Sequence, residues 1–122
     1  MNAETGIMIF LITKKYDAMK QFFIDLGLDV KSEHPGWAQV TPFLNSGRGC
    51  MIILPSLLIS LEESTDVLPS GPIYIGIDGI NEAQISGMRT KYSVKHVKGG
   101  FFGGDSYWIE PPDGGVVIAT CS

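Results

Sequence analysis

Residues 104–120, GDSYWIEPPDGGVVIAT, decide how the rest of the chain can fold. Residues 106–110 are rich in aromatic and β-branched side chains, which favour a half-buried strand. The two prolines that follow end this strand, because neither can donate a backbone hydrogen bond. Asp113 and Gly114 suit the positive φ angles of a two-residue hairpin turn, and the next glycine can add a bulge. The apolar residues 116–119 then predict a second, buried strand, so the stretch is expected to form a hairpin.

The composition is that of a folded domain. The chain has 122 residues, of which 44% are hydrophobic and 18% charged, so it can bury a core as a single domain. Its net charge of −4 and the lack of a basic block argue against binding to nucleic acid or to an anionic membrane surface. The apolar runs are too short to span a bilayer, and the first residues do not resemble a signal peptide, so we expect a cytoplasmic protein.

The first half of the chain contains a strand, a helix and three further strands. The apolar residues 6–13 predict a strand buried on both faces. Residues 16–26 have helical spacing, with Met19, Phe22, Phe23 and Leu26 on one side. Residues 28–32, 37–41 and 50–54 are interpreted as strands.

The second half repeats this order. Residues 73–78 predict a strand, residues 81–91 a helix capped by Asn81, and residues 93–97 another strand that leads into the closing hairpin. The polar and acidic residues 55–71 are interpreted as the connection between the halves, although residues 57–61 could form an edge strand or a short helix.

A faint internal repeat supports this division. Residues 37–42 align with residues 107–111, and residues 49–53 align with residues 115–119. Each half then consists of a strand, a helix and three strands. Neither half can bury its own sheet, so the two halves are expected to pair.

Several phrases together resemble the vicinal oxygen chelate superfamily, which includes glyoxalases, bleomycin-resistance proteins and extradiol dioxygenases. They are the first strand at residues 7–13, Phe22-Phe23 followed by Leu26-Gly27-Leu28, and the closing residues 105–108 and 112–115. The closing phrase of this family usually contains Asp-Pro-Asp-Gly-Asn. In this chain Pro111 replaces the first Asp and Gly115 replaces the Asn.

The resemblance implies an α+β fold of two paired βαβββ modules whose mixed, curved sheets form a cavity. The modules would be about residues 1–55 and 71–122, joined by residues 56–70 within one glyoxalase/bleomycin-resistance-like domain spanning 1–122. It also implies a homodimer. Enzymes of the family hold a divalent metal with His, Glu or Gln from the first strand of each half and from the last strand of the module.

The residues at these metal positions cannot bind an ion. The first-strand positions fall on Ile7 or Met8 in one half and on Pro72 or Ile73 in the other, with the register left open. The last-strand position falls on Ile118. None of these side chains offers the imidazole, carboxylate or thiolate that such divalent metals require, so we expect neither a metal nor another cofactor.

Other reactive side chains give no catalytic pattern. His34 lies in a predicted turn and is expected to be solvated, while His96 could face either side of its strand. Cys50 and Cys121 are too few for a disulfide scaffold and are expected to be small buried residues, with a disulfide or a reactive thiol as the alternative. We therefore assign no catalytic residue.

The resemblance places Trp108 and Glu110 in the cavity. If the two halves are symmetric, the first half contributes the equivalent face, and a glycine-flanked loop could cover the opening. The predicted ligand-binding residues are Trp37, Gln39, Met51, Phe101, Phe102, Trp108 and Glu110. Alternatively, both tryptophans are core or dimer-interface residues, Glu110 is an exposed hairpin residue, and the two phenylalanines form a dimer contact.

The function favoured by these features is small-molecule binding of the bleomycin-resistance type. A metal-free, dimer-built cavity would sequester an aromatic or cationic, drug-like molecule. The alternative is a glyoxalase- or dioxygenase-like lyase or oxidoreductase with an atypical active site, so the sequence leaves open whether the protein is an enzyme. A third possibility is a fold retained only for assembly with a partner.

Overall fold

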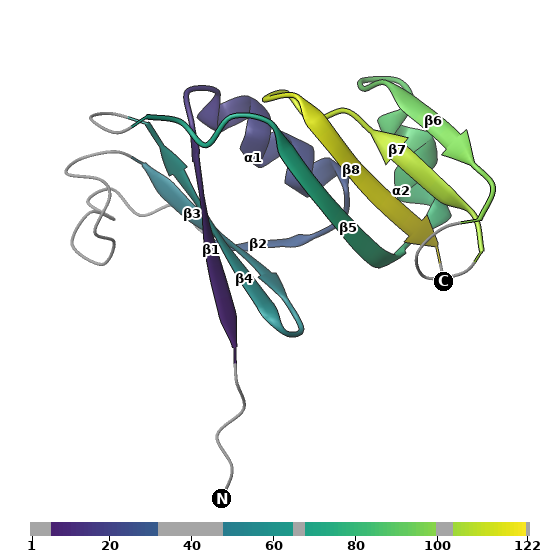
Figure 1. The fold of residues 1–122 in the computed structure, drawn as a ribbon, viewed down its shortest axis with the longest axis horizontal. Coiled ribbons are helices and arrows are strands. Elements are labelled where there is room, and N and C mark those ends of the chain that lie inside the picture. Colours follow the sequence, from purple (N-terminus) through teal and green to yellow (C-terminus); the bar gives the residue numbers. More distant parts are fainter. Residues whose placement is uncertain (1–5, 32–47, 65–67, 100–103, 122) are drawn as a thin grey trace, which may run out of the picture.

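Two matching sets of elements follow each other in the computed structural model, which describes residues 6–31, 48–64, 68–99 and 104–121 (Figure 1). The first set is β1 (Ile7–Thr13), α1 (Tyr16–Asp25), β2 (Asp29–Lys31), β3 (Gly49–Leu54) and β4 (Leu57–Glu63). The second set is β5 (Ile73–Ile80), α2 (Glu82–Met88), β6 (Val94–Val97), β7 (Ser106–Ile109) and β8 (Gly115–Cys121). The expected α+β fold of two βαβββ modules is confirmed.

Each module forms one mixed, four-stranded sheet. The strand orders are β1-β4-β3-β2 and β5-β8-β7-β6. In both sheets the first and last strands of the module run parallel, and the other neighbours are antiparallel. The sheets are curved and do not close on themselves (Figure 1). Ile7 pairs with Leu57 as Ile73 pairs with Gly115, so the strand positions of one module have counterparts in the other.

β4 lies in residues 56–70, which the sequence analysis assigned to the connection. It is an interior strand between β1 and β3, not an edge strand or a helix. The acidic end of the segment, Glu62 and Glu63, favoured a linker, although the alternation of LLISLEE is typical of a strand. Because β4 corresponds to β8 and β3 to β7, the predicted equivalence of residues 37–42 with the strand of Trp108 is wrong.

The hairpin between β7 and β8 turns one residue earlier than expected. The Gly114 N–H donates to the Pro111 carbonyl at 2.9 Å, so Pro112 and Asp113 are the central residues of the turn. The fixed φ of proline suits the first of these two positions. The positive φ angles belong to Gly114 (86°) and Gly115 (91°).

The first strand is not buried on both faces as expected. Ile7 is 60% exposed and Met8 is 43% exposed, because β1 is at the edge of its sheet and, among the described strands, pairs with β4 alone. Burial increases along the strand, and Thr13 at its end is fully buried.

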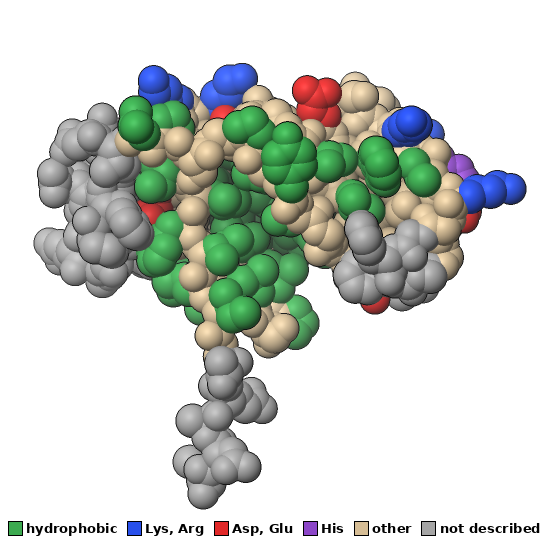
Figure 2. All heavy atoms as spheres, viewed as in Figure 1, with side chains coloured by type: hydrophobic (Ala, Val, Ile, Leu, Met, Phe, Trp, Pro, Cys, Tyr) green, Lys and Arg blue, Asp and Glu red, His purple; other side chains and the backbone are tan. Residues whose placement is uncertain are grey.

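Each sheet has one face packed against the helices and an opposite face, here called the open face. In Figure 1 both helices lie behind the sheets, and Figure 2 shows hydrophobic side chains gathered on the near side over both sheets. Side chains alternate along a strand, so the core residues Ile52 and Val117 leave their neighbours Met51 and Ile118 on the open faces.

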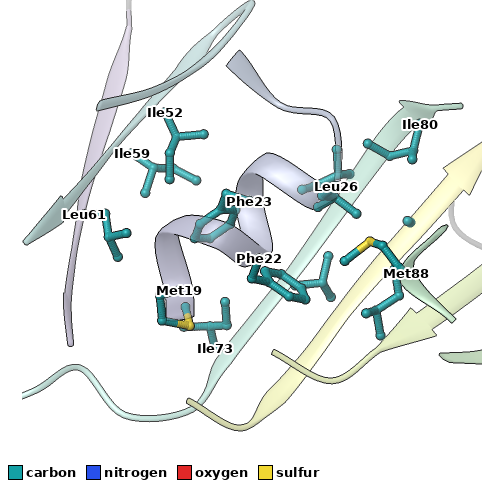
Figure 3. Packing of buried hydrophobic residues seen from close by; sticks show 14 of the residues in the cluster. Met19, Phe22, Phe23, Leu26, Ile52, Ile59, Leu61, Ile73, Ile80 and Met88 are labelled. Carbon is teal, nitrogen blue, oxygen red and sulfur yellow. The ribbon is translucent and has the colours of Figure 1, made fainter. Parts of the chain in front are cut away.

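Helix α1 supplies the centre of the hydrophobic core. Its predicted apolar side is confirmed, because Met19, Phe22, Phe23 and Leu26 have no exposed surface. In Figure 3 these side chains lie between Ile52, Ile59 and Leu61 of the first sheet and Ile73 and Ile80 of the second, with Met88 of α2 beside them. Full burial of one such side chain stabilises a fold by about 1.5–3 kcal/mol. A single helix therefore stabilises both modules.

Helix α2 begins as predicted but is shorter. The Asn81 Oδ1 accepts a hydrogen bond from the Ala83 N–H at 2.7 Å, which confirms Asn81 as the N-terminal cap. The helix ends at Met88 instead of residue 91, and a turn follows in which the Tyr92 N–H donates to the Met88 carbonyl at 2.8 Å.

Candidate functional site

Trp108 lies on the open face of the second sheet. Its side chain is 41% exposed, so it is not a core residue. It pairs with Ile118 on β8 and with Lys95 on β6. The Lys95 ammonium lies 5.7 Å from the centre of the indole ring, close enough for a cation–π attraction. The indole is therefore accessible and is held next to a positive charge.

Met51 is the counterpart of Trp108 in the first module. Met51 pairs with Ser60 and Lys31, as Trp108 pairs with Ile118 and Lys95. Both predicted residues are therefore central on an open face, each beside a lysine. A flexible thioether adapts to irregular apolar surfaces, whereas indole offers a flat stacking face.

Glu110 follows β7 directly. Its side chain is exposed, and its N–H donates to the Ser93 carbonyl at 3.1 Å, which extends the pairing of β7 with β6 by one step. An exposed carboxylate at this position carries negative charge at the end of the Trp108 strand. Four other predicted site residues, Trp37, Gln39, Phe101 and Phe102, lie outside the described residues.

The first module places a buried carboxylate on its open face that the sequence analysis missed. Glu62 has no exposed surface, and it pairs with Ile12 on β1 and with Gly49 on β3. Ser60, which is 1% exposed, lies two residues earlier on the same face. The period-two alternation of β4 could have revealed both residues, had the segment been recognised as a strand.

The residues of these faces do not fit the divalent metal of the family's enzymes. Matching the registers of the two modules places Ser60 at the counterpart of Ile118, where those enzymes use Glu. The open face of β1 offers Met8, Phe10 and Ile12, which have no ligand atoms suited to a hard cation. Among the described residues, no three His, Cys, Asp or Glu side chains gather around one point. We therefore assign no metal-dependent reaction to these residues.

His96 faces the helix side of its sheet, which resolves the orientation that the sequence left open. Its ring stacks on Tyr107 with 5.0 Å between the ring centres, and its Nε2 lies 2.9 Å from Asp105 Oδ2. His34 lies outside the described residues. Cys50 and Cys121 are free thiols, the first fully buried as expected and the second half-buried.

Comparison with solved structures defines the class of fold. It is the fold of a glyoxalase/bleomycin resistance protein, in agreement with the fold that the sequence resemblance implied. The antibiotic-binding protein TnmS3 from Streptomyces sp. CB03234 has a TM-score of 0.69 at 16% identity, covering 100% of this chain and 99% of that one. A glyoxalase/bleomycin resistance protein from the same Streptomyces has a TM-score of 0.67 at 14% identity, covering 94% and 98%.

A lactoylglutathione lyase from Agrobacterium tumefaciens is also similar. Its TM-score is 0.62 at 16% identity, with coverage of 97% of this chain and 93% of that one. Binding proteins and an enzyme thus share this fold, so the fold alone does not choose between the two functions. No family model and no curated protein matches the sequence.

No helix among the described residues combines the length and the apolar character that a transmembrane span requires.

Proposed function

We propose that the protein binds a small aromatic or cationic molecule on the open faces of its sheets and sequesters it without a metal. The observation that carries this proposal is the accessible Trp108, which is 41% exposed on the face where the fold family holds its ligands. Stacking on an indole adds about 0.5–1.5 kcal/mol beyond burial of apolar area. Lys95 covers part of the ring, so we expect the ligand to stack on the remaining indole surface.

The proposal includes a homodimer whose two chains close the cavity. Its support is apolar surface on the same side of the sheets, where Tyr74 is 73% exposed and Met8 is 43% exposed. Exposed apolar surface is typical of interaction sites. Light scattering coupled to size-exclusion chromatography tests this step, and a monomer at micromolar concentration would contradict it.

The binding itself is tested by tryptophan fluorescence. We expect ethidium, a planar aromatic cation, to quench the emission in a saturable manner. Because Trp37 also emits, the titration is repeated with Trp37→Phe and Trp108→Phe. Quenching should persist in the first variant and largely disappear in the second. No saturable quenching by ethidium or by the neutral aromatic 1-naphthol would overturn the proposal.

A second function, an enzyme with an atypical active site, is favoured by Glu62. A carboxylate without exposed surface on the open face is the kind of group that enzymes use as a general acid or base. This function predicts turnover of glyoxal–thiol adducts or catechols that is abolished in Glu62→Gln. Absence of turnover with both substrate classes would contradict the enzymatic function, and binding would be the remaining function.

A further inference from the structure

A pocket of about 810 Å³ lies at the end of the second sheet, on the side of the helices and not on the open face. Its walls come from the start of α2, from the start of β7 and from the end of β8. The side chains that line it include Asn81, Glu82, Asp105, Tyr107 and Cys121. Its volume lies within the range of small-molecule sites.

Tyr107 is held rigidly at this pocket. His96 stacks on its ring at an interplanar angle of 18°, and the Arg89 guanidinium carbon lies 5.7 Å from the ring centre. His96 is itself fixed by Asp105, 2.9 Å away. A ring clamped in this way presents its hydroxyl in one position.

The Tyr107 hydroxyl lacks a partner in the protein. The residue is only 8% exposed, yet its hydroxyl makes no hydrogen bond to any of the described residues. Burial raises the pKa of Tyr107; Glu82, Cys121 and Asp105 raise it further, and Arg89 lowers it. The hydroxyl oxygen is not sealed from solvent at the pocket, so a ligand there can bond it in place of water.

The pocket is negatively charged. Glu82 and Asp105 line it, and none of the described lining residues is a lysine or an arginine. Beside the lining, His96 faces Asp105 and Arg89 lies over the Tyr107 ring. Burial, followed by the charge of Glu82, raises the pKa of Cys121, so this thiol stays neutral at physiological pH. Glu82 makes no ion pair with any of the described residues.

The first module shows how the same place is filled by a cation. Arg48 precedes β3 there, and its guanidinium contacts the first-turn acid of α1, Asp17, at 3.0 Å and Glu63 at the end of β4 at 2.8 Å. The guanidinium also lies 4.7 Å from the centre of the Tyr16 ring. By strand pairing, Cys121 is the counterpart of Glu63 and Asp105 that of Arg48. The first-turn acid of α2 is Glu82, which directly follows the cap Asn81, whereas Asp17 lies one position further into α1.

The second module therefore keeps the first-turn acid and has an acid where the first module has its cation. We propose that this pocket binds a small organic cation carrying a guanidinium or ammonium group, which occupies the place that the Arg48 guanidinium takes in the first module. Glu82 and Asp105 supply the opposite charge, and the Tyr107 hydroxyl accepts a hydrogen bond from the cation. The site is separate from the open face of Trp108, and it does not depend on the function proposed above.

The test uses agmatine, which carries both cationic groups, and titration calorimetry on the full chain. Glu82→Gln removes one charge without changing the size of the side chain, and we expect binding to weaken by about tenfold or more, as for the loss of a charge-assisted hydrogen bond. Tyr107→Phe removes only the hydroxyl and should weaken binding by about two- to tenfold. Asp113→Asn, which changes the same charge in the hairpin turn, should bind as the unchanged protein does.

Two further measurements locate the site. Agmatine should slow alkylation of Cys121 by iodoacetamide, while the fully buried Cys50 remains unreactive in the folded protein. Asp105→Arg should abolish agmatine binding, because an internal guanidinium then fills the pocket as Arg48 does in the first module. Each variant is checked for an unchanged circular dichroism spectrum.

The proposal is overturned if agmatine does not bind. It is also overturned if Asp113→Asn weakens binding as much as Glu82→Gln does, which would indicate a general attraction to an acidic protein. Unchanged alkylation of Cys121 at saturating agmatine would place the cation elsewhere and would equally refute the proposal.

Discussion

The open faces of the two modules have the same backbone register but place their acidic groups on different strands. In the first module Glu62 on β4 pairs with Ile12 on β1. At the matching positions of the second module, Thr120 on β8 pairs with Asp78 on β5, and the Thr120 hydroxyl donates to the Asp78 carboxylate. Glu62 is fully buried, whereas Asp78 is exposed. The first module thus buries its carboxylate, Glu62, on the open face. In the second module the carboxylate of Asp78 is exposed and accepts a hydrogen bond from Thr120 on the neighbouring strand.

This difference shows that the two modules share their strand pairing and the apolar character of their helix-facing residues but differ in the residues of their open faces. Strand pairing and the helix side of each sheet are alike, because both modules bury apolar residues against a helix. The open faces bear no such constraint, so Met51 and Trp108 can differ although they occupy matching positions. A cavity built from both faces would be chemically asymmetric, with a thioether and an acid on one side and an indole on the other.

The largest effect is expected where the backbones themselves differ. Leu57 begins β4, whereas its counterpart Gly115 begins β8 with a φ of 91°. A Cβ on Gly115 would overlap the Ile73 carbonyl and lie 2.6 Å from the Ile73 nitrogen. We expect Gly115→Ala to lower the free energy of unfolding by more than about 3 kcal/mol, measured by urea denaturation.

Gly114→Ala is the matched control for this prediction. Gly114 has a similar φ of 86°, but its nearest contact would be Pro72 at 4.0 Å. The cost should be limited to backbone strain of about 1 kcal/mol. Equal effects of the two substitutions would show that strain, and not the close approach to Ile73, sets the requirement for glycine.

The next largest effect concerns the link between the modules. Asp25 at the end of α1 accepts hydrogen bonds from the Tyr92 hydroxyl at 2.8 Å and from Gln21 at 2.9 Å, and Lys91 lies 3.3 Å away. Tyr92 follows α2, so the bond joins the two modules. Asp25→Asn should lower the free energy of unfolding by about 2 kcal/mol, with one cooperative transition retained. Two separate transitions would show that the modules unfold independently.

The pH dependence of this link has a definite sign. Burial opposes ionisation of Asp25, but hydrogen bonds from Gln21, Tyr92 and Lys91 outweigh it and lower the pKa of Asp25. Its stabilisation is therefore present above the unfolded pKa of about 4 and is lost as pH falls through the lower folded value. Burial and the bond to Asp25 raise the pKa of Tyr92 to about 12, so the contribution of Tyr92 is lost as pH rises from about 10 towards that value. The difference between the protein and Asp25→Asn should shrink at acidic pH.

Most of the fold could be predicted because it depends on local patterns. The helical spacing of Met19, Phe22 and Phe23 and the capping residue Asn81 act within a few neighbouring residues, and the structure confirms them. The sequence leaves β4 open as part of the connection, an edge strand or a short helix, because burial of its acidic end, Glu62, depends on the tertiary structure and is not revealed by sequence polarity.

The candidate sites were harder to predict for the same reason. The face of the sheet on which Trp108 lies could be predicted, because strand alternation and the family resemblance agree. Its role as a ligand contact stays a prediction. The pocket beside Tyr107 could not be predicted from the sequence, because it depends on how α2 lies against β7 and β8. The correspondence between Arg48 and Asp105 appears only after the register of β4 is known.

A smaller effect on the free energy of unfolding is expected at Thr120 and Asp78, the hydrogen-bonded pair that distinguishes the two open faces. The fully buried Thr120 donates its hydroxyl to Asp78, an exposed residue that water can solvate when this bond is lost. Thr120→Val keeps the shape of the side chain, so we expect a loss of about 1 kcal/mol in urea denaturation. Thr90→Val, which removes an exposed 2.8 Å bond to the Gly87 carbonyl, should cost less. A loss above about 3 kcal/mol at Thr120 would mean that the pair organises more than these two strands.

The smallest effect is expected at Arg48, the internal cation of the first module. Arg48 is partly exposed and bonds Asp17 and Glu63 at the surface, where ion pairs contribute about 0–1 kcal/mol. Arg48→Ala should therefore lower the free energy of unfolding only slightly, and less in 1 M NaCl. The hydrogen bond from Arg48 lowers the pKa of Glu63, so this contribution is present above about pH 4 and is lost as pH falls further. A loss that salt and acid leave unchanged would show that the guanidinium stabilises the module by packing on Tyr16 and not by charge.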